Sequence, residues 1–394
     1  MSQHLMNNYG RLPVTFTKGQ GVWLWDDEGN QYLDALSGIA VTGLGHSHSE
    51  FVKAICAQAS KLIHVSNVYQ IAEQAQLADK IAAISGMDKV FFCNSGCEAN
   101  EAQIKLARLY AHNKGISSPE IIVMDKSFHG RTLATLSATG NRKVQAGFEP
   151  LVSGFVRVPF DDVEAVKQVA ARKNNVVAIL VEPVQGEGGI HIPGDMHAYF
   201  KSLRQICDDN DWLLMIDEVQ SGIGRTGTWF AYQHTGVMPD VMSLAKGLGS
   251  GVPIGACVAK GKAAEVFTPG KHGSTFGGNP FAMSAGLATL EIIEQENLRE
   301  NAQAMGDFIH QQFAEAFKGN AGIVNIRHAG LMIGIELDRP CAELVKLALA
   351  NKLLMNVTAE KVIRLLPPLI ITKEESQELV NRLVSVVNHF LKAA

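Results

Sequence analysis

Residues 176–189 read VVAILVEPVQGEGG, and their pattern indicates the fold class. Its first part, residues 176–181, is apolar and mostly β-branched, which predicts a strand that is buried on both faces. The run stops at Glu182, and a glycine-rich loop follows. Residues 212–222, WLLMIDEVQSG, repeat the arrangement, with Asp217 directly after the apolar run. Strands that lead straight into polar, glycine-rich loops are typical of a ligand-binding α/β sheet.

Further apolar runs flank these two segments, and helical patterns alternate with them. The other expected strands are Val90–Cys93, Ile121–Met124, Phe155–Val158, Val241–Leu244 and Ile254–Ala259. Between them, residues 97–113 place Ala99, Ala102, Leu106, Leu109 and Tyr110 on one helical face, and residues 195–209 have a similar pattern. Strands that are separated by helices predict an α/β fold with a mostly parallel sheet and both of its faces covered.

The two ends of the chain predict smaller units. Residues 22–25, VWLW, predict a strand that enters a turn, with residues 31–33 as its partner. Residues 280–317 predict one helical stretch with a break near Asn297, followed by strands at Ile323–Arg327, Met332–Leu337 and Val362–Leu365 and by helices at 341–351 and 374–391. We therefore expect a large domain at 46–297, a small α+β domain at 298–394, and an N-terminal segment, 1–45, that associates with the small domain.

Composition excludes several classes of protein. The 394 residues include 35 Lys+Arg and 39 Asp+Glu, and 46% of them are hydrophobic. Disorder requires low hydrophobicity with a high net charge, and a nucleic-acid-binding protein usually has a basic excess. No apolar run has the length of a membrane span, and residues 1–20 contain no secretory signal. We expect a globular, cytoplasmic protein that binds neither nucleic acid nor membrane.

Cysteine and histidine spacing does not predict a metal site or a disulfide framework. The six cysteines include no CxxC pair. Cys93 and Cys97, and likewise His46 and His48, lie close in sequence, but no complementary ligand pair stands at the spacing of a zinc site.

Charged, polar or glycine residues follow five of the expected strands. They are the segments 94–98, 128–131, 182–189, 217–222 and 245–247. Because ligands bind beyond the carboxyl ends of the strands in an open α/β sheet, we expect these segments to form one site.

The chemistry of these residues fits pyridoxal phosphate. Ser95, Gly96 and Cys97 open a helix and suit a phosphate, although a serine before a helix is also an ordinary N-cap. Asp217 and Lys246 both follow apolar strands, so each is poorly solvated, and they either pair with each other or hold a ligand between them. With such a cofactor, the lysine amine forms a Schiff base and the aspartate keeps the pyridine nitrogen protonated.

Eight stretches, in order along the chain, resemble the class-III, fold-type-I, pyridoxal-phosphate aminotransferases. They are LDALSGIAVTGLGHSH (33–48), NSGCEANEAQIKLAR (94–108), FHGRTL (128–133), VEPVQGEGG (181–189), DEVQSGIGRTG (217–227), LAKGLGSGVPIGA (244–256), HGSTFGGNP (272–280) and RLLPPL (364–369). The resemblance implies a large domain with a mostly parallel central sheet, a smaller α+β domain, and a homodimer with shared active sites.

The resemblance also implies a role for each cofactor-binding residue. Lys246 is expected to be the catalytic Schiff-base lysine. Asp217 is expected to contact the pyridine nitrogen, Gln220 the ring 3′-oxygen, and Phe128 and Val219 the two ring faces. The expected phosphate contacts are Ser95, Gly96 and Cys97. In the family, Thr275 reaches the phosphate of the neighbouring subunit. Cys97 is a departure, because the family often has threonine there, and a thiol is a poorer phosphate donor than a hydroxyl.

Three residues are expected to bind substrate. By resemblance, Arg131 holds the far carboxylate of both substrates, because its planar fork matches a carboxylate. Arg364 would bind the carboxylate beside the reacting carbon of glutamate, and Glu187 would neutralise Arg364 when an ω-amine binds. The plainer alternatives are an exposed strand-end arginine and a loop glutamate, and Glu182 is expected to organise its neighbours rather than to act in catalysis.

The expected reaction moves the δ-amine of N2-acetylornithine to 2-oxoglutarate, giving N-acetylglutamate 5-semialdehyde and glutamate in arginine biosynthesis. Ile39 argues against free ornithine, because ornithine-specific relatives carry tyrosine in that stretch. Succinylornithine, N-succinyl-diaminopimelate and 4-aminobutyrate stay open as donors, and Asn67 and Tyr69 receive no role. A dinucleotide-binding oxidoreductase is disfavoured, since Gly247, Gly249 and Gly251 do not form GxGxxG.

Overall fold

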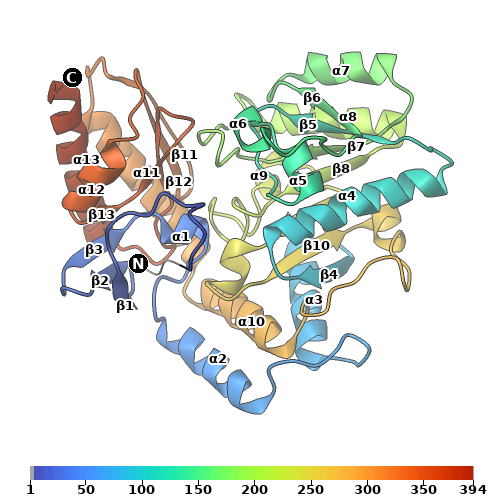
Figure 1. Ribbon diagram of the computed structural model, residues 1–394, viewed down its shortest axis with the longest axis horizontal. Helices are drawn as coiled ribbons and strands as arrows, with labels where there is room; N and C mark the ends of the chain where they lie inside the picture. Colours follow the sequence, from blue (N-terminus) through green and yellow to red (C-terminus); the bar gives the residue numbers. More distant parts are fainter. Residues whose placement is uncertain (1–3, 394) are drawn as a thin grey trace.

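The computed structural model describes residues 4–393, and within them the strands form three sheets (Figure 1). The largest is a seven-stranded sheet in the order β4-β10-β9-β8-β7-β5-β6. Its strands are β4 (Lys89–Cys93), β5 (Glu120–Met124), β6 (Phe155–Val158), β7 (Val176–Val181), β8 (Leu213–Asp217), β9 (Val241–Leu244) and β10 (Gly255–Ala259). All of them correspond to the predicted apolar runs, with ends that differ by one residue at most, so the α/β prediction is confirmed.

The direction of the strands decides where a ligand can bind. β10 runs antiparallel to its neighbours β4 and β9, whereas the pairs β9–β8, β8–β7, β7–β5 and β5–β6 are parallel. The carboxyl ends of β4 and β5–β9 therefore lie along one edge of the sheet. Every loop that the sequence singled out leaves from that edge.

Side chains that alternate along each strand divide the core in two. In β5, Ile121 and Val123 pack in one apolar cluster with α4 (Gly96–Asn113), while Ile122 and Met124 belong to the cluster that contains α8 (Met196–Asn210). Because neighbouring residues of a strand point to opposite faces, helices must cover both faces of this sheet. The helices that complete this part are α2 (Ser49–Lys61), α3 (Ala72–Ser85), α5 (Leu133–Ala138), α6 (Arg142–Gln145), α7 (Val163–Arg172), α9 (Tyr232–Thr235) and α10 (Pro280–Gln295).

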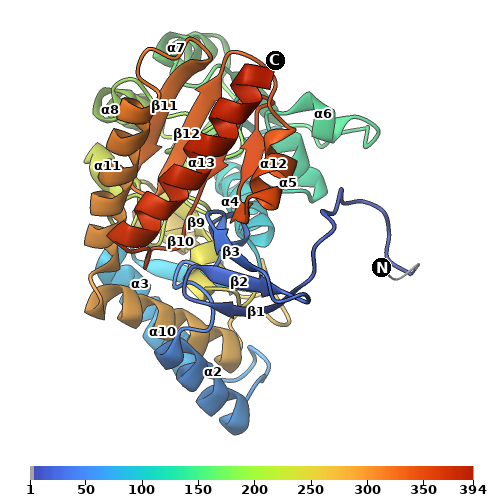
Figure 2. The ribbon, with the colours of Figure 1, turned by 90° about the vertical axis from the view of Figure 1, so that its left-hand side faces the viewer.

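The C-terminal residues form a separate antiparallel sheet in the order β11-β12-β15-β14. Its strands are β11 (Ile323–Ala329), β12 (Met332–Leu337), β14 (Asn356–Thr358) and β15 (Val362–Leu365). Three helices accompany it, α11 (Leu298–Ala316), α12 (Leu344–Ala350) and α13 (Lys373–Ala393), and α13 crosses in front of the strands in Figure 2. Asn297 has a left-handed φ of 52°, which separates α10 from α11 as the sequence predicts.

The third sheet joins the two ends of the chain. Its strands are β1 (Phe16–Gln20), β2 (Trp23–Asp26), β3 (Gln31–Asp34) and β13 (Leu353–Leu354), and β13 pairs with β3 in parallel. Figure 1 shows these N-terminal strands beside the C-terminal helices and strands. This pairing supports the expected association of residues 1–45 with the C-terminal unit, although the division at 45 and 297 stays our proposal.

Several elements were not predicted. They include α2, with Phe51 and Gln58 as its buried residues, and α3, with Leu77, Ile81 and Ser85. The predicted helix at 341–351 is shorter, because residues 341–343 form a turn before α12 begins. None of the helices between residues 4 and 393 has the length and apolar character needed to cross a membrane.

Candidate active site

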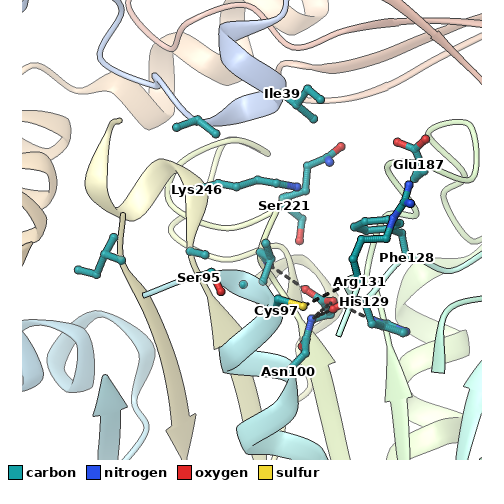
Figure 3. A pocket seen from close by; sticks show the side chains of 18 of the residues that line it. Ile39, Ser95, Cys97, Asn100, Phe128, His129, Arg131, Glu187, Ser221 and Lys246 are labelled. Atoms are coloured by element: carbon teal, nitrogen blue, oxygen red, sulfur yellow. Dashed lines mark hydrogen bonds and ion pairs between the residues drawn. The ribbon is translucent and has the colours of Figure 1, made fainter. Parts of the chain in front are cut away.

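A cavity of about 640 Å³ opens at the carboxyl edge of the central sheet. All five predicted loops contribute to its lining. The predicted site residues among the lining residues are Ser95, Gly96, Cys97, Phe128, Arg131, Glu187, Asp217, Val219, Gln220 and Lys246. Figure 3 shows Lys246 and Ile39 above Ser95 and Cys97, with Phe128 and Glu187 to one side. The site that was expected from five separate strand ends is thus one cavity.

The first turn of α4 provides an anion cradle in this cavity. Ser95 is the N-cap, and its Oγ accepts the N–H of Glu98 at 3.2 Å. The earlier N–H groups of a helix have no intrahelical acceptor and suit a phosphate, so the N-cap role of Ser95 is compatible with an anion bound at the same turn. A Cβ on Gly96 would lie 2.5 Å from Cγ1 of Val219, which shows that Val219 packs directly against the cradle.

The thiol of Cys97 supports the neighbouring loop. Its Sγ accepts the N–H groups of Arg131 at 3.2 Å and Thr132 at 3.3 Å, and it lies 3.2 Å from the hydroxyl of Thr135. Gly130 has a φ of 139°, and a Cβ there would lie 2.5 Å from the same sulfur. The side chain of Cys97 therefore binds protein groups, and its contribution to an anion would come from the backbone.

Asp217 is buried at the end of β8 and is held by four donors. Its Oδ2 accepts from Asn100 Nδ2 at 2.7 Å and lies 2.8 Å from His129 Nδ1, while its Oδ1 accepts the N–H of Val219 at 3.0 Å and the hydroxyl of Ser243 at 3.3 Å. Burial by itself raises the pKa of this carboxyl, but the hydrogen bonds and the charge of His129 outweigh burial and lower it. The side chain that pairs with Asp217 in the structure is therefore His129, and the alternative pairing with Lys246 is not the one observed.

Lys246 begins a 3₁₀ helix, η1 (Lys246–Gly249), with a left-handed φ of 42°. Burial, and then the charge of Arg364, lower the pKa of its ammonium to about 8. Glu182 lies nearby and is buried, and its Oε2 accepts the N–H of Phe128 at 3.0 Å. Burial and the charge of Asp217 raise the pKa of Glu182 well above its ordinary value. A lysine that loses its proton near neutral pH is suited to act as a nucleophile and base.

Arg364 and Glu187 form an ion pair beside the cavity. Arg364 Nη1 lies 3.0 Å from Glu187 Oε2, and the arginine side chain is 1% exposed while the glutamate side chain is 46% exposed. Arg364 is thus a buried strand residue of β15, and Glu187 is its partner rather than an unattached loop residue. Burial lowers the pKa of Arg364, and the charge of Glu187 opposes that effect.

Arg131 and Ile39 also line the cavity. The Arg131 guanidinium lies 5.7 Å from the centroid of the Phe128 ring and is exposed. Ile39 lies in α1 (Ser37–Ala40), where all four residues have a left-handed φ between 52° and 70°. Such a conformation is costly away from glycine and is concentrated at functional sites. Thr275 is exposed and does not line this cavity.

Sequence reasoning missed three buried residues that hold Asp217, namely Asn100, His129 and Ser243. Asn100 lies one helical turn after Gly96, so its place on the cavity side of α4 could have been inferred from the periodicity. His129 stands inside the FHGR segment, where only Phe128 and Arg131 received roles. Among residues 4–393, no three His, Cys, Asp or Glu side chains gather in a way that would hold a metal ion.

The cavity fits pyridoxal phosphate by two observations. At the start of α4, Gly96 lets Val219 lie directly against the turn that lines the cavity, because a Cβ there would lie 2.5 Å from Val219 Cγ1. The Oε1 atom of Gln220 is buried and has no hydrogen-bond partner in the described part of the chain, so a polar atom faces a place for a ligand. A buried anionic Asp217 and a Lys246 of lowered pKa complete the donor set that this cofactor requires.

Comparison with known proteins defines the class. The family model for class-III aminotransferases matches residues 5–387, so the chain belongs to the class-III aminotransferase family, whose members are pyridoxal-phosphate-dependent enzymes. The acetylornithine aminotransferase of Nitrosomonas europaea is 62% identical over 390 residues, which are 99% of each chain.

Two solved structures have the same fold. The N-acetylornithine aminotransferase of Stenotrophomonas maltophilia K279a superposes with a TM-score of 0.86 at 34% identity, covering 98% of both chains. An ornithine aminotransferase from Toxoplasma gondii, which has pyridoxal phosphate at its active site, superposes with a TM-score of 0.93 at 33% identity, covering 98% of this chain and 92% of the other.

Proposed function

We propose that this enzyme transfers the δ-amino group of N2-acetylornithine to 2-oxoglutarate, giving N-acetylglutamate 5-semialdehyde and glutamate, as a step of arginine biosynthesis. One observation of the site carries the proposal: a buried arginine, Arg364, is neutralised by a partly exposed Glu187. Such a pair suits a site that must accept one substrate with a carboxylate beside the reacting carbon and one without it. The name of the 62% identical relative supports the choice of acetylornithine.

Most of the residues at the cofactor site would hold the cofactor, and one of them would transfer protons. Ser95, Gly96 and Cys97 would bind the phosphate through backbone N–H groups and the Ser95 hydroxyl, Phe128 and Val219 would cover the ring, and Gln220 and Asp217 would bind its oxygen and nitrogen. When bound, pyridoxal phosphate supplies an electron sink for the carbon next to the reacting nitrogen. Lys246 would form the covalent link and later carry the proton, because its pKa is lowered to about 8, so that both forms of its amine are populated near that pH.

Three side chains would determine which substrates bind. Arg131 would bind the carboxylate distant from the reacting carbon in both substrates. Arg364 would bind the second carboxylate of glutamate. When an ω-amine is bound, Glu187 would remain paired with Arg364, so that the buried charge of Arg364 is not left unpaired. Another ω-amine, namely ornithine, succinylornithine, N-succinyl-diaminopimelate or 4-aminobutyrate, is the alternative donor, and the ornithine aminotransferase fold neighbour keeps ornithine in consideration.

Turnover of four amine donors with 2-oxoglutarate tests the proposal. N2-acetylornithine is expected to have the highest kcat/KM, above ornithine, N-succinyl-diaminopimelate and 4-aminobutyrate. A higher value for any of the other three would overturn the assignment of the donor. Lys246→Ala is the control for the chemistry, and wild-type turnover by that variant would overturn the assignment of the reaction itself.

We also propose a cytoplasmic homodimer in which Thr275 of one protomer binds the phosphate held by the other. Thr275 stands among exposed apolar side chains, since Ile63, Tyr69 and Phe276 are each more than half exposed. Asn67 joins their segments, because its Nδ2 donates to the carbonyls of Ser274 and Gly277. An exposed apolar surface of this kind favours a partner subunit. The six free cysteines suit a reducing compartment.

A further inference from the structure

The loop that carries Glu187 is fastened to the C-terminal sheet. We define the Glu187 loop as residues 186–190, between β7 and α8. Arg327, on β11, donates from Nε to the carbonyls of Gly189 at 3.0 Å and Ile190 at 2.9 Å, and its Nη2 also donates to Gly189. The Thr358 hydroxyl, on β14, donates to the carbonyl of Glu187 itself. These contacts join a loop of the central sheet to two strands of another sheet.

Arg327 is itself held in a single orientation. Its Nη1 lies 2.6 Å from Glu336 Oε2, on the neighbouring strand β12, and its side chain is 12% exposed. The planar guanidinium therefore uses one edge for Glu336 and the other for the loop carbonyls, which a lysine cannot do. Gly189 sits close enough that a Cβ would lie 3.5 Å from Arg327 Nη2.

The same sheet also fixes Arg364. Arg364 lies on β15, opposite Gly334 of β12 and Asn356 of β14, and its Nε donates to Asn356 Oδ1 at 3.1 Å. One four-stranded sheet thus positions both members of the Arg364–Glu187 pair. Arg364 lies on the sheet, and the Glu187 loop is bound to it through Arg327 and Thr358. The freedom that remains is rotation of the Glu187 side chain, which is the exposed partner.

We propose that Arg327 is a positioning residue that sets how well Glu187 neutralises Arg364, and hence how strongly the enzyme distinguishes the ω-amine donor from glutamate. The inference rests on the proposed function, in which Glu187 covers Arg364 for one substrate and leaves it for the other. Without Arg327, the Glu187 loop loses its donors to Gly189 and Ile190, and the carboxylate is held less firmly on Arg364. The amine donor then meets an unpaired buried arginine, while glutamate meets an arginine that is already free.

The experiment measures each half-reaction of the holoenzyme in single turnovers, followed by the absorbance of the bound cofactor. In Arg327→Met, kcat/KM for N2-acetylornithine is expected to fall about tenfold relative to kcat/KM for glutamate, as the loss of charge-assisted hydrogen bonds would produce. Thr358→Val, which removes the other contact, is expected to change the ratio in the same direction. Arg327→Lys is expected to behave like Arg327→Met, because it keeps the charge and loses the fork.

Arg339→Met is the matched control. Within residues 4–393 the Arg339 side chain is 39% exposed and pairs with its neighbour Asp338, not with the Glu187 loop. It is expected to leave the ratio unchanged. An equal fall of both half-reactions in Arg327→Met, with a lowered Tm, would show a purely structural role and overturn the inference, and so would an unchanged ratio. If Arg327→Met does not fold, Thr358→Val and Arg327→Lys decide by the same ratio.

Glu187→Ala separates this inference from the proposed function. If Glu187→Ala leaves the ratio of the half-reactions unchanged, the proposed use of Glu187 fails, and the inference fails with it. If Glu187→Ala changes the ratio and Arg327→Met does not, only the inference fails. Combining the two substitutions is expected to change the ratio no further than Glu187→Ala alone, because Arg327 acts through Glu187.

Discussion

His129 Nδ1 lies 2.8 Å from Asp217 Oδ2, and both side chains are buried behind the candidate cofactor site. Asn100 donates to the same carboxylate oxygen at 2.7 Å. These two donors, together with the N–H of Val219, lower the pKa of Asp217 and outweigh burial, which raises it. An anion fixed there suits the protonated pyridine nitrogen that the chemistry requires.

Asp217→Asn is expected to lower kcat about a hundredfold, the usual effect of removing one prepared electrostatic group from an active site. Pyridoxal phosphate should still bind, because the cradle at the start of α4 is unchanged. The measurement is steady-state turnover together with the cofactor content of the purified protein. Asp240→Asn is the matched control, since Asp240 also accepts from β8, through the N–H of Leu214 at 2.8 Å, but outside the cavity. Wild-type kcat in Asp217→Asn would contradict the role of Asp217.

Glu187→Ala is expected to shift relative kcat/KM toward glutamate and away from the ω-amine by about tenfold. The reason is that Arg364 loses its neutralising partner, which costs more when the bound substrate offers no second carboxylate. Separate assays of the two half-reactions measure the shift. Glu374→Ala, at an exposed position of α13, should leave the ratio as it is in the wild type. An unchanged ratio in Glu187→Ala would argue against the carboxylate switch.

Gly96→Ala is expected to weaken pyridoxal-phosphate binding by about tenfold or more, because overpacking typically costs ~1–3 kcal/mol. The new Cβ would lie 2.5 Å from Val219 Cγ1 and would push apart the phosphate cradle and the residue beneath the ring. Titration of the apoprotein with the cofactor, followed by absorbance, gives the Kd. Gly10→Ala is the control, since a Cβ there meets no atom within 4 Å. Equal Kd values in the two variants would refute the placement of the phosphate.

The stability of the protein is expected to depend on pH through Glu218. This buried carboxylate accepts the N–H of Tyr232 and the hydroxyl of Ser221, and burial raises its pKa from 4.5 to about 7. Between these two pH values the folded state binds more protons than the unfolded state, so this group's contribution to stability falls as pH rises. Above pH 7 the ionised, buried carboxylate costs up to about 3 kcal/mol.

Glu218→Gln removes the titration and is expected to flatten this dependence. The difference in unfolding free energy between wild type and variant, measured in urea at pH 5 and pH 8, isolates Glu218 from other titrating groups. The variant should gain relative stability at pH 8. A difference that is the same at both pH values would rule out the raised pKa as a source of pH dependence.

Local sequence patterns were enough to predict the strands of the central sheet, the start of α4 and the residues at the carboxyl edge. These features are local: apolar runs of strand length, a serine before a helix, and polar residues directly after a run. Because parallel strands end at one edge, local information was enough to predict that Asp217, Lys246 and Ser95 share one site.

The pairing of side chains, by contrast, follows from the tertiary structure. The partner of Asp217 is His129 rather than Lys246, since the two strand ends place His129 Nδ1 within hydrogen-bond distance of the carboxylate. The hydrogen bond from Arg327 to Gly189 joins two sheets, and the two-residue strand β13 pairs with β3, which lies more than 300 residues earlier in the sequence. No local pattern encodes such contacts, because they depend on the packing of elements that are distant in sequence, and packing fixes distances that periodicity leaves open.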